Sequence, residues 1–146
     1  MQLPKTILVA TDFSAAAEAA LDQALLLAVK LEAKVYLLHA YLLPIVGFPD
    51  GVLLPSADMA TRIMTSAQTE LANAVAKRKG SGIVIQPILK QADAREAVLA
   101  TAEDLSADLI VMGTHGRKGI ARALIGSVAE ALVRAAPVPV TVHAPS

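Results

Sequence analysis

Short apolar runs alternate with longer helical patterns along the whole chain, and this alternation constrains the fold more than any other feature. The expected strands are apolar at successive positions, which is typical of strands buried on both faces. A helical segment between successive strands supplies the crossover that parallel neighbours need. We therefore expect an α/β domain with a parallel sheet and helices on both faces. The strands are expected at residues 6–10, 34–40, 83–89, 108–112 and 138–142.

Signals at helix ends support the segments between these strands. Asp93 with Glu96 three residues later forms a capping box, and Gly80 with Gly82 ends the preceding helical pattern. The basic run 77–79 is expected to be the solvated end of that helix, where positive charge is favourable. The helices are expected at residues 14–31, 56–79 and 93–105, with another starting after Ser127.

Composition excludes several classes of function. The 146 residues match one average domain, and no repeat or linker divides them, so residues 1–146 are expected to form a single domain. The chain has no cysteine, which excludes disulfides and thiolate metal sites. Thirteen basic and 13 acidic residues cancel without a positive cluster, so nucleic acid is not an expected partner. No apolar stretch reaches the roughly 18 residues of a membrane span and no signal-peptide pattern is present, so we expect a cytoplasmic protein.

Two segments are candidates for contact with other chains. Pro139 cannot donate a hydrogen bond to a strand partner, so the last strand is expected at a sheet edge. The edge Val138–Val142 either pairs with a second copy or is simply blunted by proline. The long, apolar segment Tyr41–Pro55 either packs on its own domain or covers a ligand or meets a protein partner.

The segment between Gly113 and Ser127 is the strongest candidate for a binding site. Its glycines allow positive φ and close approach of a ligand, and successive backbone N–H groups in such a turn attract anions. Ser127 with Glu130 forms a second capping box, so a helix is expected from Val128 with its N-terminus facing the loop, which favours phosphate. Three basic residues, Arg117, Lys118 and Arg122, add donors. The alternative is that the glycines only turn the chain and Ser127 only caps a helix. The spacing fits neither the Walker A pattern nor G-x-G-x-x-G.

The same segment resembles the G-x2-G-x9-G-(S/T) nucleotide loop of the universal stress protein family, through Gly113, Gly116 and Gly126-Ser127. Four further segments resemble that family in order, namely ILVATDFS at 7–14, LLHA at 37–40, ADLIVMG at 107–113 and APVPV at 136–140. The resemblance implies a five-stranded parallel sheet in the order 3-2-1-4-5, usually in homodimers paired through the fifth strand. In that order the connections reverse between strands 1 and 4, and ligands of open α/β sheets bind at such a switch point.

The resemblance further implies that ATP is the ligand, with Mg or Mn carried by its phosphates. Ala10, Thr11 and Asp12 match residues that line the adenosine end, where the Asp12 carboxylate would accept hydrogen bonds from adenine or ribose. Ala40 matches the position that packs on adenine. The positions that match ribose and phosphate contacts are Met112, Gly113, His115, Gly116, Arg117, Gly126, Ser127 and Val128. Without a ligand, Asp12 would still favour the N-terminus of the following helix.

The expected function is that of an ATP-binding regulatory protein in a stress response, whose conformation or assembly depends on the nucleotide. Slow ATP hydrolysis, or autophosphorylation on Ser127 or Thr114, is one alternative, although no general base stands out. A partner-binding module independent of nucleotide is another. His39 and His143 are expected to be structural or exposed, since the histidine spacing supports no metal site. We also expect bulky residues at Gly113 or Gly126 to abolish binding while the nucleotide-free protein stays folded.

Overall fold

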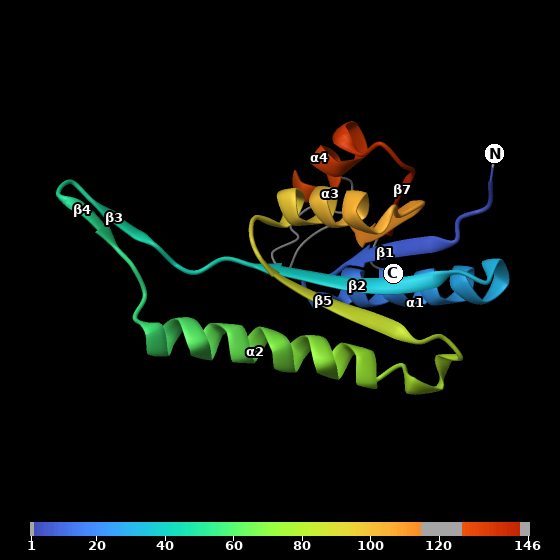
Figure 1. The fold of residues 1–146 in the computed structure, drawn as a ribbon, viewed down its shortest axis with the longest axis horizontal. Helices are drawn as coiled ribbons and strands as arrows, with labels where there is room; N and C mark the ends of the chain where they lie inside the picture. The colour runs from blue at the N-terminus through green and yellow to red at the C-terminus, as the bar shows by residue number, and fades with distance from the viewer. Residues whose placement is uncertain (1, 115–126, 144–146) are drawn as a thin grey trace.

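The computed structural model describes residues 2–114 and 127–143, which form one parallel sheet with helices on both faces (Figure 1). The sheet has five strands in the order β5-β2-β1-β6-β7, all pairs parallel, which confirms the predicted 3-2-1-4-5 order. Its strands are β1 Thr6–Ala10, β2 Lys34–Tyr41, β5 Ile85–Gln91, β6 Leu109–Gly113 and β7 Val140–His143. The helices are α1 Ala15–Leu31, α2 Ala57–Ala76, α3 Ala94–Leu105 and α4 Ser127–Ala135, with a short 3₁₀ turn, η1 Lys79–Ser81.

The helices divide into two layers because successive side chains of each strand point to opposite faces. Ile7 and Val9 of β1 pack with α1 and α2, whereas Leu8 between them packs with α3 and α4. All three side chains are fully buried. The unbroken apolar pattern of the strand is thus explained by a core on each side of the sheet (Figure 1).

The two outer strands differ from their predicted ranges by two residues at their starts. The third strand of the sheet begins at Ile85 instead of 83, and the fifth begins at Val140 instead of 138. Pro139 therefore precedes β7, and its carbonyl accepts a hydrogen bond from the Ile110 N–H at 3.0 Å. The predicted edge position of this last strand is confirmed.

Side-chain caps fix the starts of three helices. The hydroxyl of Ser14 accepts a hydrogen bond from the Ala17 N–H at 3.2 Å, at the start of α1. Ser56 caps α2 in the same way, and Asp93 accepts from the Glu96 N–H at the start of α3. The cap at Asp93 confirms the prediction from the sequence, whereas Ser14 and Ser56 had been expected as the first helical residues.

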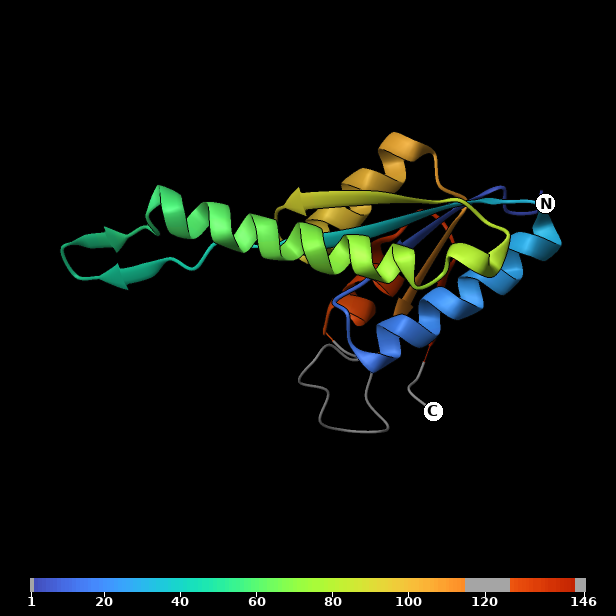
Figure 2. The same ribbon diagram turned by 90° about the horizontal axis from the view of Figure 1, so that it is seen from below.

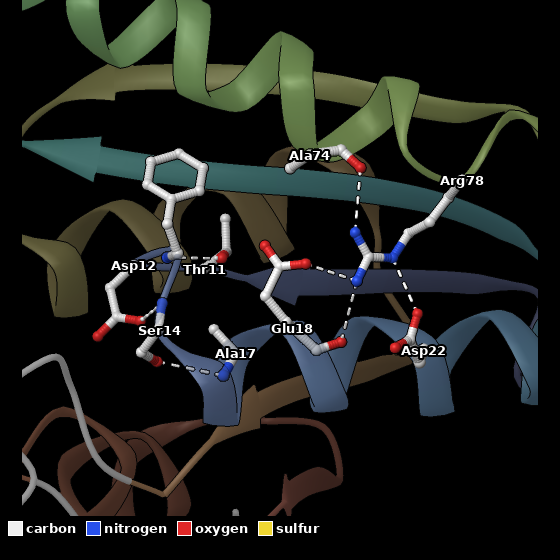
Figure 3. A network of polar contacts seen from close by, with 9 residues as sticks. Thr11, Asp12, Ser14, Ala17, Glu18, Asp22, Ala74 and Arg78 are labelled. Carbon is white, nitrogen blue, oxygen red and sulfur yellow. Dashed lines mark hydrogen bonds and ion pairs between the residues drawn. The ribbon is translucent and has the colours of Figure 1, made fainter.

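The basic run at residues 77–79 is not simply a solvated helix end, because Arg78 reaches back to α1 (Figure 3). Its Nη2 donates to a carboxylate oxygen of Glu18 at 2.6 Å, its Nε donates to Asp22 at 2.9 Å, and its Nη1 donates to the Ala74 carbonyl. The Arg78 side chain is only 11% exposed. Burial lowers its pKa, but hydrogen bonds to Asp22 and Glu18 outweigh that effect and raise it, so the guanidinium stays charged. This cluster fastens the end of α2 to α1.

The segment between β2 and α2 extends away from the rest of the domain (Figures 1 and 2). It carries a two-stranded antiparallel hairpin, β3 Val46–Phe48 and β4 Gly51–Leu53, where the sequence predicted irregular structure. Every residue of both strands is exposed, so the alternative that this segment packs on its own domain is wrong. The helix that follows is also exposed over its first ten residues apart from two half-buried positions, and its buried residues are Ala67, Leu71 and Ala74.

Candidate functional site

A pocket of about 210 Å³ lies at the carboxyl ends of the central strands β1 and β6. These strands are neighbours, but β1 connects through α1 to β2 on one side, and β6 leads through α4 to β7 on the other. Such a reversal leaves a crevice between the two connections. The pocket is lined by Ala10, Thr11, Asp12, Ala17, Leu38, Ala40, Ala94, Val98, Met112, Gly113, Thr114, Ser127, Val128 and Ala129.

Eight of the sequence-predicted site residues meet in this one pocket. They come from β1 and the turn after it, from β2, from β6 and from the start of α4. They are Ala10, Thr11, Asp12, Ala40, Met112, Gly113, Ser127 and Val128. The remaining four, His115, Gly116, Arg117 and Gly126, lie outside the described residues.

The turn between β1 and α1 is held by short polar contacts (Figure 3). The Thr11 hydroxyl accepts a hydrogen bond from the Phe13 N–H at 3.0 Å, and an oxygen of Asp12 accepts from the Ser14 N–H at 2.9 Å. These bonds hold Phe13 in the left-handed region, with φ of 65°. That conformation costs an L-residue with a bulky side chain about 1–2 kcal/mol. The strained turn delivers Asp12 to the pocket rim.

His39 supports this turn from the neighbouring strand and is structural, as predicted. Its Nδ1 lies 2.8 Å from the carbonyl oxygen of Thr11, and because a carbonyl only accepts, this nitrogen carries the proton. The imidazole also packs on the Phe13 ring, with centroids 4.4 Å apart. The end of β1 is therefore fixed by side-chain contacts from β2 as well as by the sheet ladder.

Asp12 contacts the turn before α1 and also lines the pocket. Its contact with the Ser14 N–H shapes the turn before α1, and the same half-buried residue lines the pocket. A carboxylate has two oxygens with about four lone-pair sites, so it can accept several hydrogen bonds at once. Asp12 can hold the turn and still accept a hydrogen bond from a ligand.

Gly113 lies against the first turn of α1, which gives this glycine a packing role that the sequence analysis did not foresee. A Cβ built there would lie 2.9 Å from the backbone carbon of Ala16, 2.9 Å from the Ala16 Cβ and 2.9 Å from the Ala17 nitrogen. The space that a side chain would need is thus filled by the first turn of α1. A bulky residue at Gly113 is therefore expected to disturb the nucleotide-free fold, contrary to our expectation from the sequence.

The described start of α4 also lines the pocket. The described part of α4 runs from Ser127 to Ala135, and Glu130 lies in its first turn. Ser127 and Val128 line the pocket, and a helix N-terminus carries positive potential.

Sequence reasoning missed the part of the pocket that α3 supplies. Ala94 and Val98 are one turn apart on α3 and form an apolar wall together with Leu38 of β2. Their spacing of four, directly after the Asp93 cap, was the available signal. Thr114 was also missed as a lining residue. Its hydroxyl oxygen is buried and has no hydrogen-bond partner within the part of the chain that the structure describes.

The described residues contain no group of three or more histidine, aspartate or glutamate side chains that could hold a metal ion. In the same residues, no helix has the length and apolar character needed to cross a membrane. The chemistry of the pocket is that of a small-molecule site: apolar walls, one carboxylate, a few hydroxyls and a helix N-terminus.

Known proteins are similar to this chain in sequence and in fold. The model of the universal stress protein family matches residues 4–143. The universal stress protein MJ0531 of Methanocaldococcus jannaschii is 32% identical over 143 residues, which cover 96% of this chain and 82% of that protein. The solved structure of MJ0577, from the same organism, superposes with a TM-score of 0.81 over 99% of both chains at 24% identity, which supports the fold alone. A universal stress protein solved in complex with cAMP is 26% identical, with a TM-score of 0.74 over 99% of this chain and 100% of that one. This chain belongs to the universal stress protein family.

Proposed function

We propose that this protein binds an adenine nucleotide, namely ATP with Mg or Mn on its phosphates, and acts as a nucleotide-dependent regulator in a cytoplasmic stress response. The observation that carries the proposal is the polarity of the switch-point pocket. A carboxylate, Asp12, the N-terminus of α4 and several apolar side chains all line this pocket. The carboxylate and the helix N-terminus favour different parts of one nucleotide.

The apolar wall suits a flat, weakly polar base. Ala40 and Leu38 of β2 and Val98 of α3 offer aliphatic surface from two directions. The small side chain of Ala40 leaves room for a ring against the strand. Burial of a base on this wall would supply the non-directional part of the binding energy, at about 25 cal/mol for each Å² of apolar area removed from water.

The Asp12 carboxylate and the N-terminus of α4 are expected to determine how the nucleotide is oriented in the pocket. The Asp12 carboxylate accepts hydrogen bonds from a ribose hydroxyl or an amino group, whereas it repels phosphate. The first turn of α4, from Ser127, attracts phosphate. We therefore propose that adenosine lies towards the end of β1 and that the phosphates lie towards α4. In this orientation Gly116, Arg117 and Gly126 of the G-x2-G-x9-G-(S/T) loop would contact the phosphates.

Two further observations support a ligand in this pocket. The buried Thr114 hydroxyl lacks a protein partner among the described residues, and buried hydroxyls are seldom left without one. The 26% identical relative was solved with cAMP, which is an adenine nucleotide. We extend this property to the present chain as a proposal.

The binding experiment is thermal unfolding with and without Mg-ATP, ADP, AMP and cAMP. A ligand at 100 times its dissociation constant should add about 2.7 kcal/mol to the free energy of unfolding. Phosphate release by the same samples separates a regulator from a slow ATPase. If none of the four nucleotides raises the unfolding temperature, the proposal fails and the nucleotide-independent module becomes the better reading.

Asp12→Asn tests the assigned orientation. The asparagine oxygen can still accept from the Ser14 N–H, so the turn should survive, while the charged acceptor for the ligand is lost. We expect the affinity for ATP to fall about 5-fold, since a hydrogen bond to a charged group exceeds a neutral one by about 1 kcal/mol. Asp104→Asn, at an exposed position of α3, is the control and should leave affinity unchanged. Equal affinities in both variants would contradict a ligand contact by Asp12.

The assembly we propose is a homodimer paired through Val138–Val142. Its observable basis is that β7 is an edge strand and that all four of its residues are half-buried. Unpaired N–H and C=O groups on such an edge are a template for a second strand. The mass of the particle in solution, compared with 15.1 kDa for one chain, tests this assembly.

A further inference from the structure

Residues 42–55, here called the arm, expose an unusual amount of apolar surface. Seven large apolar side chains in the arm are between 48% and 64% exposed: Leu42, Ile45, Val46, Phe48, Val52, Leu53 and Leu54. They follow one another along a segment that points away from the domain (Figure 2). Single exposed apolar residues are common, but contiguous patches of this kind mark interaction sites.

The hairpin in the arm lacks support from its own domain on both faces. Val46 pairs with Leu53 and Gly47 with Val52, so Val46 and Leu53 lie on one face while Val52 lies on the other. All of these residues are exposed, so neither face is covered by the described part of the chain. Isolated two-stranded hairpins are marginal in water even when longer than three residues a strand. The arm therefore requires another surface packed against its apolar side chains in order to hold this conformation.

The charge of the arm restricts what that surface can be. Asp50, in the turn, is the only charged residue between positions 42 and 55. A nucleic acid or a strongly charged peptide finds no complementary charge there. A second arm, in contrast, presents equally apolar surface and no like-charge clash along the strands. Self-complementarity is the requirement for a two-fold contact between identical chains.

The exposed area agrees with such a contact. If each of the seven side chains loses on the order of 100 Å², the arm buries on the order of 700 Å², against about 800 Å² a partner in a standard interface. Each strand of the hairpin also has one edge without a partner in the two-stranded sheet. Edge pairing about a two-fold axis would satisfy those backbone groups as well.

We propose that the arm is an interface with a second copy of this chain, in which the two arms pack against each other and bury their apolar side chains. This contact is separate from the proposed pairing through β7, because β7 lies at the far edge of a different sheet. Two different two-fold contacts on one chain build a tetramer when their axes intersect at right angles. The arm contact does not depend on bound nucleotide.

The absence of cysteine makes a direct test available, since a single introduced thiol is the only one in the protein. Val52→Cys on the arm should give a covalent dimer in high yield on mild oxidation at micromolar concentration. Leu26→Cys, with a side chain 65% exposed on α1, is the matched control and should remain monomeric on a reducing-agent-free gel. Equal crosslinking of the two variants, or none of Val52→Cys, would overturn the proposal.

The second test measures the mass of the particle in solution, by light scattering of the protein as it elutes from a size-exclusion column. Val52→Glu places a charge in the proposed contact and should halve the mass of the particle, with Leu26→Glu as the control at wild-type mass. An unchanged thermal shift with Mg-ATP in Val52→Glu would show that the arm and the nucleotide site are independent. Wild-type mass for Val52→Glu, or equal loss of mass in both variants, would refute a contact between copies. Co-sedimentation of the wild type, but not Val52→Glu, with phosphatidylcholine–phosphatidylglycerol vesicles would also refute it, in favour of a lipid surface.

Discussion

Gly113→Ala measures how closely α1 packs on the end of β6. The new methyl carbon would lie 2.9 Å from the backbone carbon and Cβ of Ala16 and 2.9 Å from the Ala17 nitrogen, about 0.6 Å inside the normal contact distance between carbons. These neighbours belong to the capped first turn of α1, so relief requires a shift of the helix start and not of a flexible side chain. Overpacking of this kind costs about 1–3 kcal/mol, and the stiffer unfolded chain returns about 0.4–1 kcal/mol. We expect a net loss of about 1–2 kcal/mol.

Urea unfolding followed by circular dichroism, without nucleotide, gives this free energy directly. Gly80→Ala is the matched control, because a Cβ at Gly80 meets nothing within 4 Å, and its stability should stay within about 0.5 kcal/mol of the wild type. The slope with denaturant should be the same for all three proteins. Wild-type stability for Gly113→Ala would refute the close packing and restore the idea that this glycine serves the ligand alone.

Two contacts in the N-terminal half of α1 are open to similar measurements. Arg78→Met keeps the apolar stem but strands the carboxylate of Glu18, which is 27% exposed, so we expect a loss of about 1–3 kcal/mol in urea unfolding. Arg62→Met, which breaks an ion pair with both partners 76% exposed, should change stability by less than about 1 kcal/mol; equal losses in the two variants would contradict the Arg78 assignment. Ser14→Ala removes the cap of α1 and should cost about 1 kcal/mol, and no loss of thermal stability would show that the cap is dispensable.

The positions of the strands and helices could be predicted because the sequence patterns that mark them arise from neighbouring residues. Runs such as Ile7–Val9 are apolar at every position only when both faces of a strand are covered, and this alone separates a parallel sheet from an antiparallel one. The helix start at Asp93 followed from a capping pattern whose partners lie within four residues of each other. The strand order itself came from the family resemblance. Strand starts near Ile85 were less certain, since ladder pairing with distant residues decides them.

The features that sequence reasoning missed are set by contacts between distant residues. Arg78 lies 60 positions from Glu18, so its buried ion pair could not be distinguished from an exposed basic run. The same is true of Gly113, whose missing side chain is explained by Ala16 of a different element. The α3 side of the pocket was missed for this reason too. By contrast, the residues next to strand ends, such as Asp12, were predictable because parallel strands bring their carboxyl ends together.

The anchoring of α2 by its second half has a mechanical consequence. The buried residues of α2 begin at Ala67, and the ion pair of Arg78 with Glu18 fixes the end of the helix to α1. The ten helical residues before Ala67 therefore extend beyond the sheet without packing on it. A helix of about ten residues is marginal when it has no tertiary support. Amide hydrogen exchange should therefore slow abruptly near Ala67 within one continuous helix. Loss of the Arg78 ion pair would also free the C-terminal end of α2 from α1. A substitution at Arg78 is therefore expected to increase the mobility of the β3–β4 hairpin, although the two are not in contact.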